Sequence, residues 1–243
     1  MKDNLGDRMK SNYENRTRYF LPRRSYTLIR VDGKAFHTFT KGLERPFDLG
    51  LIEDMDATAA YLCKNIMGAK FAFVQSDEIN ILLTDFEENT TQAWFDCNLQ
   101  KMASVSASMA TRAFNEARMK RLGDKMKWAE FDSRIFQISD KEEVANYFVW
   151  RQQDTVRNSI SSVAQALYSH KELEKKNTTQ MQELIFQKGT NWNDFPVKQK
   201  RGRLIVREVY EKEPNVIRSA WNSIEPPTFT QDRDFLMSKI PTL

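Results

Sequence analysis

Two short hydrophobic runs flank a polar tetrad in the first half of the chain. Phe71–Val74 and Ile79–Leu83 are rich in aromatic and aliphatic residues that favour a pleated, half-buried backbone. The tetrad between them, Gln75 to Glu78, reads Q-S-D-E, and Ser and Asp favour turns. The pattern predicts two antiparallel strands joined by a tight turn at the rim of a sheet.

The same periodicity predicts elements on both sides of this hairpin. Tyr26–Val31 is a β-rich run that ends in Asp32-Gly33, which predicts a strand with a carboxylate at the sheet rim. From Asp48 to Gly68 the apolar positions step by three and four, which predicts an amphipathic helix that Asp48 caps. Further along, the sequence predicts a helix over 92–121, a strand over 128–138, and helices over 141–170 and 179–188.

The order of the first elements predicts the fold class. Strand, helix, strand, strand, helix, strand is the split βαβ, ferredoxin-like pattern, which is also the layout of a polymerase palm. We therefore expect an α+β fold, a βαββαβ antiparallel sheet with helices on one face, with additional C-terminal helices and strands. We expect residues 1–140 to form a palm-like catalytic domain with a basic N-terminal arm. Residues 141–243 form an extension packed on it, or one continuous domain with it, and the proline-rich tail from Glu211 is expected to be irregular.

Candidate catalytic carboxylates lie at the predicted strand ends. If the strands that carry Asp32 and Asp77 are neighbours, the two carboxylates converge, and hard cations such as Mg²⁺ take such oxygen ligands. Glu78 adds a second negative charge beside Asp77, so we expect a cation to offset the repulsion. The alternative for both sites is a solvated turn, because Asp, Ser and Gly favour turns in any case.

Composition narrows the possible classes of protein. The chain has 243 residues, of which 40% are hydrophobic and 29% are charged, so it can bury a core and is not of the disordered class. Two cysteines without zinc-type spacing predict a reduced, cytoplasmic protein. No run approaches the ~20 apolar residues of a membrane span, and the N-terminus has no apolar signal core. The glycines form neither the Rossmann nor the Walker phosphate loop.

Basic residues gather in two segments. The net charge is only +4, so the positions of the basic residues indicate more about possible partners than the net charge does. Residues 1–24 form either a phosphate-contacting helix or a solvated arm. The stretch 188–207, beside Trp192, suits contact with an RNA backbone, although a solvated strand edge also uses Lys and Arg. Its cations are Lys188, Lys198, Lys200, Arg201, Arg203 and Arg207.

Four short motifs follow one another along the chain. They read R-V-D-G-K-A-F-H at 30–37, Q-S-D-E at 75–78, Y-F-V-W-R-Q-Q-D at 147–154, and K-G-T-N-W-N-D-F-P at 188–196 with K-R-G at 200–202. Together with the helix that carries Lys101, they resemble the tRNA-His guanylyltransferases and their guanylyltransferase-like relatives. These enzymes extend RNA in the 3′-to-5′ direction. The resemblance covers roughly residues 5–210.

The resemblance implies two Mg²⁺ ions, ATP and GTP as substrates, tRNA as a partner and a tetramer. It makes Asp32 and Asp77 the metal carboxylates, with the Gly33 carbonyl as a further ligand and Glu78 among the catalytic residues. The nucleotide-binding residues that it implies are Asp32, Gly33, Lys34, Ala35, Phe36, His37, Arg45, Ser76, Asp77, Lys101, Asp154 and Asn158. The RNA-binding residues that we expect are Arg23, Arg24, Arg157, Lys188, Lys198, Lys200, Arg201 and Arg203. From spacing alone, an internal salt bridge from Arg151 to Asp154 is at least as probable as a functional site.

One departure from the family bears on specificity. The eukaryotic enzymes carry His-Ile-Asn-Asn where this chain has Val156, Arg157, Asn158 and Ser159. The sequence thus resembles the bacterial and archaeal branch, which implies template-dependent repair of the tRNA 5′ end, with ATP activation of the 5′-phosphate and two-metal nucleotidyl transfer. The alternatives are a tRNA-His-specific enzyme that adds one guanosine, a palm-fold nucleotidyl cyclase and a non-catalytic RNA-binding module.

Overall fold

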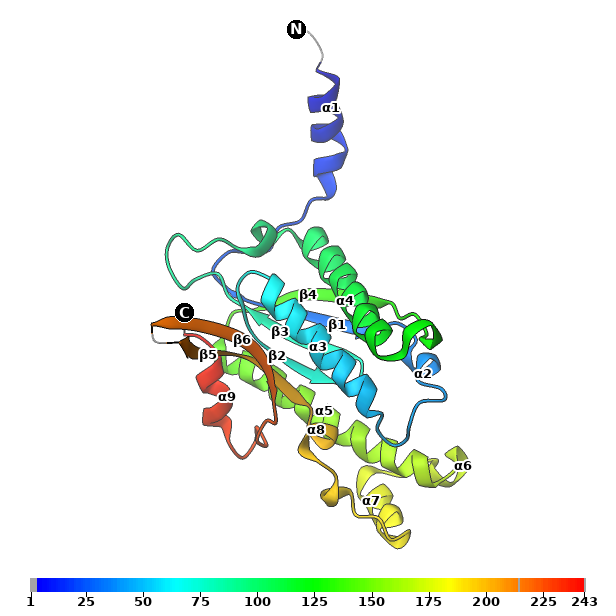
Figure 1. Ribbon diagram of the computed structural model, residues 1–243. Coiled ribbons are helices and arrows are strands. Elements are labelled where there is room, and N and C mark those ends of the chain that lie inside the picture. Colours follow the sequence, from blue (N-terminus) through cyan, green and yellow to red (C-terminus); the bar gives the residue numbers. More distant parts are fainter. Residues whose placement is uncertain (1–3, 214, 243) are drawn as a thin grey trace.

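The fold is built on one antiparallel sheet. The computed structural model describes residues 4–213 and 215–242. Its six strands lie in the order β4-β1-β3-β2-β5-β6 (Figure 1). The strands are β1 (Tyr26–Gly33), β2 (Ala69–Gln75), β3 (Glu78–Leu83), β4 (Phe131–Ile138), β5 (Arg203–Glu213) and β6 (Val216–Ile224). The helices and helical turns are α1 (Leu5–Asn12), η1 (Glu14–Thr17), α2 (Phe36–Phe39), α3 (Leu49–Asn65), η2 (Trp94–Cys97), α4 (Leu99–Leu122), η3 (Gly123–Lys125), α5 (Lys141–Leu167), α6 (His170–Leu173), α7 (Thr178–Gln187), η4 (Trp192–Asp194), α8 (Val197–Lys200) and α9 (Arg233–Lys239).

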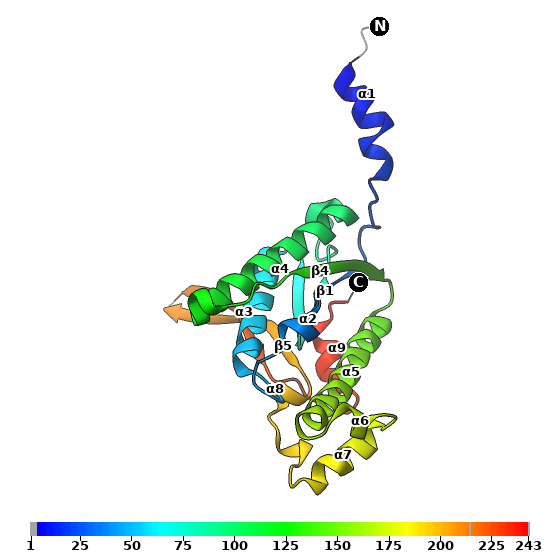
Figure 2. The ribbon, with the colours of Figure 1, turned by 90° about the vertical axis from the view of Figure 1, so that its right-hand side faces the viewer.

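Helices cover both faces of this sheet. The predicted succession of strands and helices is present as β1-α3-β2-β3-α4-β4, and α3 and α4 pack on one face. The later helices α5 and α9 pack on the other face (Figure 2). Because β5 and β6 extend the same sheet beyond β2, the C-terminal part shares its framework with the N-terminal part.

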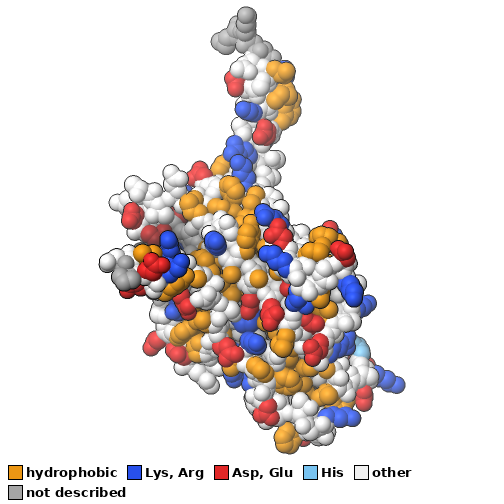
Figure 3. Space-filling view, in the orientation of Figure 1, with side chains coloured by type: hydrophobic (Ala, Val, Ile, Leu, Met, Phe, Trp, Pro, Cys, Tyr) orange, Lys and Arg blue, Asp and Glu red, His pale blue; other side chains and the backbone are white. Residues whose placement is uncertain are grey.

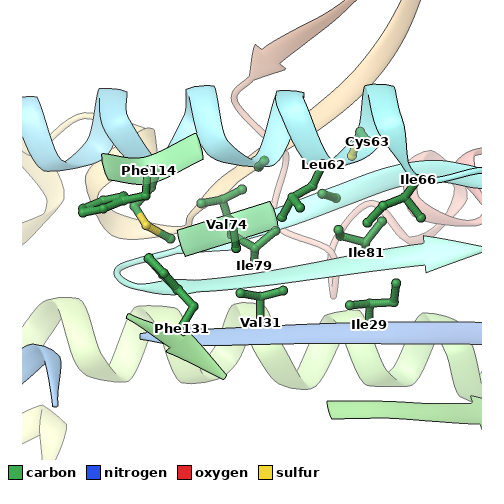
Figure 4. Close-up of a cluster of buried hydrophobic side chains, with 14 of the residues drawn as sticks. Ile29, Val31, Leu62, Cys63, Ile66, Val74, Ile79, Ile81, Phe114 and Phe131 are labelled. Carbon is green, nitrogen blue, oxygen red and sulfur yellow. The ribbon is translucent and has the colours of Figure 1, made fainter. Parts of the chain in front are cut away.

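Side chains alternate between the two faces, as the pleat of a strand requires. Ile29 and Val31 of β1 point toward α3 and α4, where they meet Leu62 and Phe114 in the larger core (Figure 4). Leu28, between them in sequence, belongs to the second core under α5 and α9. Burial on both faces explains why the central strands read as nearly continuous apolar runs.

The C-terminal half of α5 extends past the sheet and has a small core of its own. Ile160 and Val163 of α5 pack there with Ile185 of α7 and with Trp192. This cluster makes α5, α6 and α7 one helical unit below the sheet (Figure 1). None of the described helices, α4 and α5 included, is long and apolar enough to cross a membrane.

The face toward α5 changes from apolar to polar at one end of the sheet. Along β1, Leu28 is followed on this face by Arg30 and Asp32. In register with them, β3 places Asn80 opposite Arg30 and Glu78 opposite Asp32. This end of the sheet therefore presents charged side chains beneath α5, among them several of the predicted site residues.

The N-terminal segment forms an arm that projects from the body of the molecule (Figures 1 and 2). No residue of α1 is buried. Exposed Leu5, Met9 and Tyr13 repeat every four residues along it, and Figure 3 shows hydrophobic side chains in a band along one side. Residues 1–3, which the predicted basic arm includes, lie outside the described residues.

The helix predicted over 92–121 begins later than expected. Phe95, Asp96 and Cys97 have positive φ angles, which excludes them from a right-handed helix. Asn98 then caps α4, because its side-chain oxygen accepts the N–H of Lys101 at 3.0 Å.

Two other predicted boundaries shift by a few residues. β4 begins at Phe131 rather than at Trp128, which is exposed and precedes the sheet. α5 ends at Leu167, before His170, because Ser169 forms a capping box that starts the separate helix α6.

The prediction of an irregular tail from Glu211 is wrong. β5 continues to Glu213 and pairs with β6, and α9 follows on the second face of the sheet. Pro226 and Pro227 lie between β6 and α9, and Pro214 lies outside the described residues. Prolines here mark the gaps between elements, so their frequency does not indicate a lack of structure.

Gly202 allows a close approach of the K-R-G turn to β2. Its φ is +81°, and a Cβ there would lie 2.6 Å from the Phe73 ring and 2.9 Å from the Val74 carbonyl oxygen. We expect Gly202→Ala to lower the free energy of unfolding by about 2–4 kcal/mol, from backbone strain plus overpacking. Gly189 is the matched control, because its φ is +77° but a Cβ would meet nothing within 4 Å. In urea unfolding, Gly189→Ala should cost only about 1 kcal/mol; equal losses would contradict the packing argument.

Candidate active site

The polar end of the sheet and the middle of α5 enclose a cleft of about 570 Å³. Its walls come from the end of β1, the β2–β3 turn, the loop that precedes α3, and α5. The cleft brings together many of the residues predicted from the sequence. These are Asp32, Arg45, Ser76, Asp77, Glu78, Asp154, Asn158, Lys198 and Arg203.

Two carboxylates meet at the sheet rim. The N–H of Gly33 donates to the Asp77 carbonyl oxygen at 3.1 Å, which joins the end of β1 to the β2–β3 turn. Among the described residues, Arg30 at 3.5 Å and Arg134 at 3.7 Å form long ion pairs with the Asp32 carboxylate, both with its Oδ2. Asp77 forms no ion pair with any of the residues that the structure describes. Both carboxylates therefore retain oxygen atoms for a ligand.

Burial raises the pKa of both carboxyl groups. Desolvation is the main reason that the pKa of Asp77 rises to about 6, and the charges of Asp32 and Glu78 add to the rise. Desolvation, followed by repulsion from Glu78, also raises the pKa of Asp32, which Arg30 and Arg134 partly oppose. A bound cation would relieve this unfavourable charge.

The loop after β1 presents backbone N–H groups. Ala35 has a φ of 54° and α2 begins at Phe36. Across the described ranges, no hydrogen bond engages the N–H groups of Ala35, Phe36 and His37. Successive N–H groups of this kind form an anion-binding concavity. Gly33 must be glycine, because a Cβ would lie 2.2 Å from the Phe36 ring.

Glu78 lies at the edge of this cleft, but its carboxylate is bonded to residues of the protein interior. It is only 5% exposed and accepts hydrogen bonds from Gln75 at 3.1 Å and from Asn80 at 2.7 Å. Its carboxylate also pairs with Arg30 at 2.5 Å and with Arg151 at 2.8 Å. Both oxygens are thus occupied, which favours a structural role for Glu78 over the catalytic one that we predicted.

The α5 wall is fixed by the same network. Arg151 donates to Asp154 at 2.6 Å, and Arg157 pairs with the other oxygen of Asp154. The internal salt bridge that the spacing allowed is therefore formed. Thr155 donates to Gln75 at 2.6 Å, which joins α5 to the end of β2. Asp154 thus reaches the cleft as part of an ion-paired cluster.

Some predicted nucleotide-binding residues lie outside the cleft. Lys34 turns to the opposite side and pairs with Glu130. Phe36 is buried in the larger core, so its side chain contributes packing only. Lys101 stands over the Phe95 ring near the start of α4. Thr111, whose hydroxyl accepts the N–H of Phe131 at the start of β4, lies about 15 Å further along α4 than Lys101.

Two of the predicted RNA contacts are inside the protein. Lys200 is buried and donates to the Asn193 carbonyl at 2.5 Å, and Arg203 is buried and pairs with Asp56 of α3 at 2.6 Å. Both cations are bonded to partners inside the protein, which argues against a phosphate contact by either side chain, although Arg203 also lines the cleft. The neighbouring Lys198 is exposed.

The other predicted RNA contacts are dispersed, and all of them except the half-buried Arg201 are exposed. Arg23 and Arg24 precede β1, at the end of that strand opposite Asp32, and Arg23 pairs with Asp85. Lys188 stands over the Tyr168 ring, at the end of α7. Arg157 is exposed and pairs with Asp154 of the cleft wall.

Three polar residues that support the site were not predicted from the sequence. Arg30, Asn80 and Tyr147 connect the sheet to α5, and the Tyr147 hydroxyl donates to Asn80 at 2.5 Å. The sequence does contain a signal for them, because Arg30 is a polar residue two positions before Asp32 in an otherwise apolar strand. Glu78 and Asn80 repeat this pattern in β3. A spacing of two places each pair on one face.

Comparisons with known proteins identify the family of the chain. The sequence profile of the family described as "Thg1: tRNAHis guanylyltransferase" matches residues 6–139, more than half of the chain. The chain is 29% identical over 210 residues to the tRNA(His) guanylyltransferase of Saccharomyces cerevisiae, which covers 79% of this chain and 86% of that protein. It is also 29% identical over 244 residues to the uncharacterized protein R259 of Acanthamoeba polyphaga mimivirus, covering 90% of this chain and 82% of that one.

Solved structures show the same likeness. A bacterial tRNA(HIS) guanylyltransferase (Thg1)-like protein in complex with ATP superposes with a TM-score of 0.89 at 49% identity, over 98% of this chain and 99% of that chain. The Saccharomyces cerevisiae enzyme superposes with a TM-score of 0.70 at 26% identity, over 82% and 91% of the two chains. Sequence and structure together show that this chain belongs to the Thg1 family of tRNA(His) guanylyltransferases.

Proposed function

We propose that this protein adds nucleotides to the 5′ end of tRNA and selects them by pairing with the opposite strand. One observation carries the proposal. The carboxylates of Asp32 and Asp77 converge at a cleft of about 570 Å³, next to a loop with free N–H groups. A cleft of this size accommodates one small ligand. The βαββαβ succession with carboxylates at strand ends supports the view that this part is a polymerase-type palm.

The donors at the rim fit Mg²⁺. Within residues 4–213 and 215–242, no group of three or more His, Cys, Asp or Glu side chains converges as a metal site. Mg²⁺ often takes one or two carboxylates and completes its shell with water and substrate phosphates. We therefore assign Asp32, Asp77 and the Gly33 carbonyl to two Mg²⁺ ions. Bound there, the ions would stabilise the attacking and leaving oxygens of phosphoryl transfer.

Residues of this chain would position the nucleotide. The N–H groups of Ala35, Phe36 and His37, with Ser76, form the site that we assign to the triphosphate. Arg45 approaches from the loop before α3. Relatives were solved in complex with ATP and with GTP, which supports both nucleotides as substrates.

The reaction has two steps. The 5′-phosphate of the RNA first attacks the α-phosphorus of ATP and releases pyrophosphate, since an unactivated phosphate has no good leaving group. The 3′-hydroxyl of the incoming nucleotide then attacks the activated 5′-phosphate and releases AMP. A 5′-triphosphate would serve directly and release pyrophosphate. The protein contributes mainly positioning and charge compensation.

The residues at 156 and 157 support selection by base pairing. Val156 packs against the small core of α5, α6 and α7, and Arg157 pairs with Asp154. Valine has no hydrogen-bonding group for a base edge, and the charge of arginine favours a phosphate. Neither side chain supplies a means to identify one tRNA.

We expect Asp77→Asn to abolish Mg²⁺-dependent addition and yet to stabilise the metal-free protein. At pH 7.5 the folded chain holds Asp77 ionised although burial raises its pKa to about 6. Removing that charge should raise the free energy of unfolding by about 2 kcal/mol. The gain should be full above about pH 6 and should be lost as the pH falls below about 4, where Asp77 of the wild type is protonated in both the folded and the unfolded state. Urea unfolding in EDTA measures this; a destabilised variant, or one with normal activity, would contradict the assignment.

We expect Lys198→Gln and Arg201→Gln to weaken tRNA binding and to flatten its salt dependence. Each phosphate contact that is lost should reduce the log–log slope by roughly 0.7–0.9. GTP binding should be unchanged. Lys212→Gln, an exposed lysine on the β5–β6 hairpin, is the control. An unchanged slope in the first two variants would exclude this segment from the RNA interface.

Templated addition is testable with two tRNAs that lack their 5′ nucleotide and differ only in the opposing base, neither of them tRNA-His. We expect guanosine to be added opposite cytidine, and the complementary nucleotide opposite adenosine. Pairing alone would discriminate, because a mismatch loses hydrogen bonds and stacking that the protein does not replace. Addition of guanosine to both, or extension of tRNA-His only, would refute the templated mechanism.

A further inference from the structure

A second pocket, of about 580 Å³, lies on the α3 face of the sheet. Its walls come from the C-terminal half of α3 and from β5 and β6. Two aromatic residues, Tyr61 and Trp221, and two cations, Lys64 and Arg207, border it. Among the described residues that line it, none is acidic and none also lines the cleft. Its volume is close to that of the cleft, so it too accommodates one small ligand.

The register of the strands directs Arg207 and Trp221 to the same face. Ile205 belongs to the core beneath α3, and the alternation along β5 puts Arg207 on that side as well. Trp221 is the partner of Arg207 in β6 and packs, half buried, against the same core. Across the pocket, Lys64 follows Tyr61 by three residues, so the two side chains are neighbours on α3.

The two cations of this pocket have no compensating charge. Lys64 and Arg207 are exposed, and neither forms an ion pair with any residue of the described ranges. Asp56 lies on α3 between the residues that border the cleft and those that border the pocket. Both of its oxygens are occupied, by Arg203 at 2.6 Å and by Ser223 at 2.8 Å. Exposed cations beside aromatic side chains are the combination with which proteins hold unpaired nucleotides.

The pocket lies within reach of an RNA strand that leaves the cleft. Arg203 borders the cleft and Arg207 borders the pocket, and four residues of a strand span about 13 Å. When the 5′ end of an acceptor stem is in the cleft, the opposite strand continues past the templating base as unpaired nucleotides. Four of these span about 14 Å at the spacing of about 3.4 Å between stacked nucleotides, which matches that separation.

We propose that this pocket binds the unpaired 3′ end of the RNA substrate, with a base on Trp221 and phosphates at Lys64 and Arg207. The proposal rests on the proposed function. It adds a second contact, which holds the templating strand while the 5′ end is extended. Because the pocket lies outside the cleft, the base bound there leaves the stacking position of the incoming nucleotide free.

The test compares two RNA hairpins that lack their 5′ nucleotide. One ends at the templating base, and the other continues for four unpaired nucleotides at its 3′ end. We expect the wild type to bind the longer RNA about 5- to 100-fold more tightly, the range for one base–aromatic stack. Lys64→Gln and Arg207→Gln should each reduce the log–log salt slope for the longer RNA by about 0.7 and leave binding of the shorter RNA unchanged. Lys212→Gln, at an exposed lysine of β5 outside the pocket, is the matched control and should behave as the wild type.

The fluorescent base 2-aminopurine, placed in the 3′ extension, tests the stack itself. Stacking on an indole quenches this fluorophore, so we expect quenching with the wild type and its loss with Trp221→Leu. Trp221 also packs against the core, so the melting temperature of this variant is measured as well. The exposed residues Lys64 and Arg207 test the site without a change in the core.

Three results would overturn the proposal. One is equal affinity of the wild type for the two RNAs. Another is an equal loss of affinity for both RNAs in Lys64→Gln and Arg207→Gln, which would assign these cations to the duplex. The third is unchanged quenching with a folded Trp221→Leu. Failure of the proposed function is distinguishable, because templated addition to the shorter RNA tests that function without the pocket.

Discussion

The buried carboxylate of Glu78 joins the two walls of the cleft. It lies between Arg30 of β1 and Arg151 of α5, with Gln75 and Asn80 donating to the remaining lone pairs. Loss of one partner from such a cluster leaves an unpaired buried charge and costs about 3–5 kcal/mol. Because Arg30 also approaches Asp32 and Arg151 holds Asp154, one carboxylate positions both the rim of the sheet and the helix above it.

The adjacent residues Asp77 and Glu78 thus differ in their environments. Glu78 begins β3, points to the α5 face and is saturated with donors. Asp77 lies in the turn, has no cation beside it within the described chain and has a raised pKa. An uncompensated charge lowers the stability of the folded protein, and residues of this kind are typical of binding sites. The arrangement supports a ligand of opposite charge at Asp32 and Asp77, and it leaves Glu78 to maintain the geometry.

The hydrophobic periodicity was sufficient to predict the elements near the site, but it could not predict the contacts between their side chains. The hairpin around Gln75 to Glu78 and the helix capped by Asp48 depend on local signals, and both are present. The burial of Arg203 depends on Asp56, 147 residues away in sequence, so spacing could not reveal it. The same limit applies to Glu78, whose saturation needs Arg30 and Arg151. The tail was misjudged because its prolines were counted without regard to their position between elements.

We propose that Asp32 and Asp77 bind the metal ions and that Glu78 does not. Electron paramagnetic resonance of Mn²⁺, titrated into the protein with GTP present, counts the bound ions. We expect Glu78→Gln to bind as many ions as the wild type, with weaker affinity because Arg30 is then free to pair with Asp32. Asp32→Asn should bind fewer. A loss of bound ions in Glu78→Gln equal to that in Asp32→Asn would contradict the account.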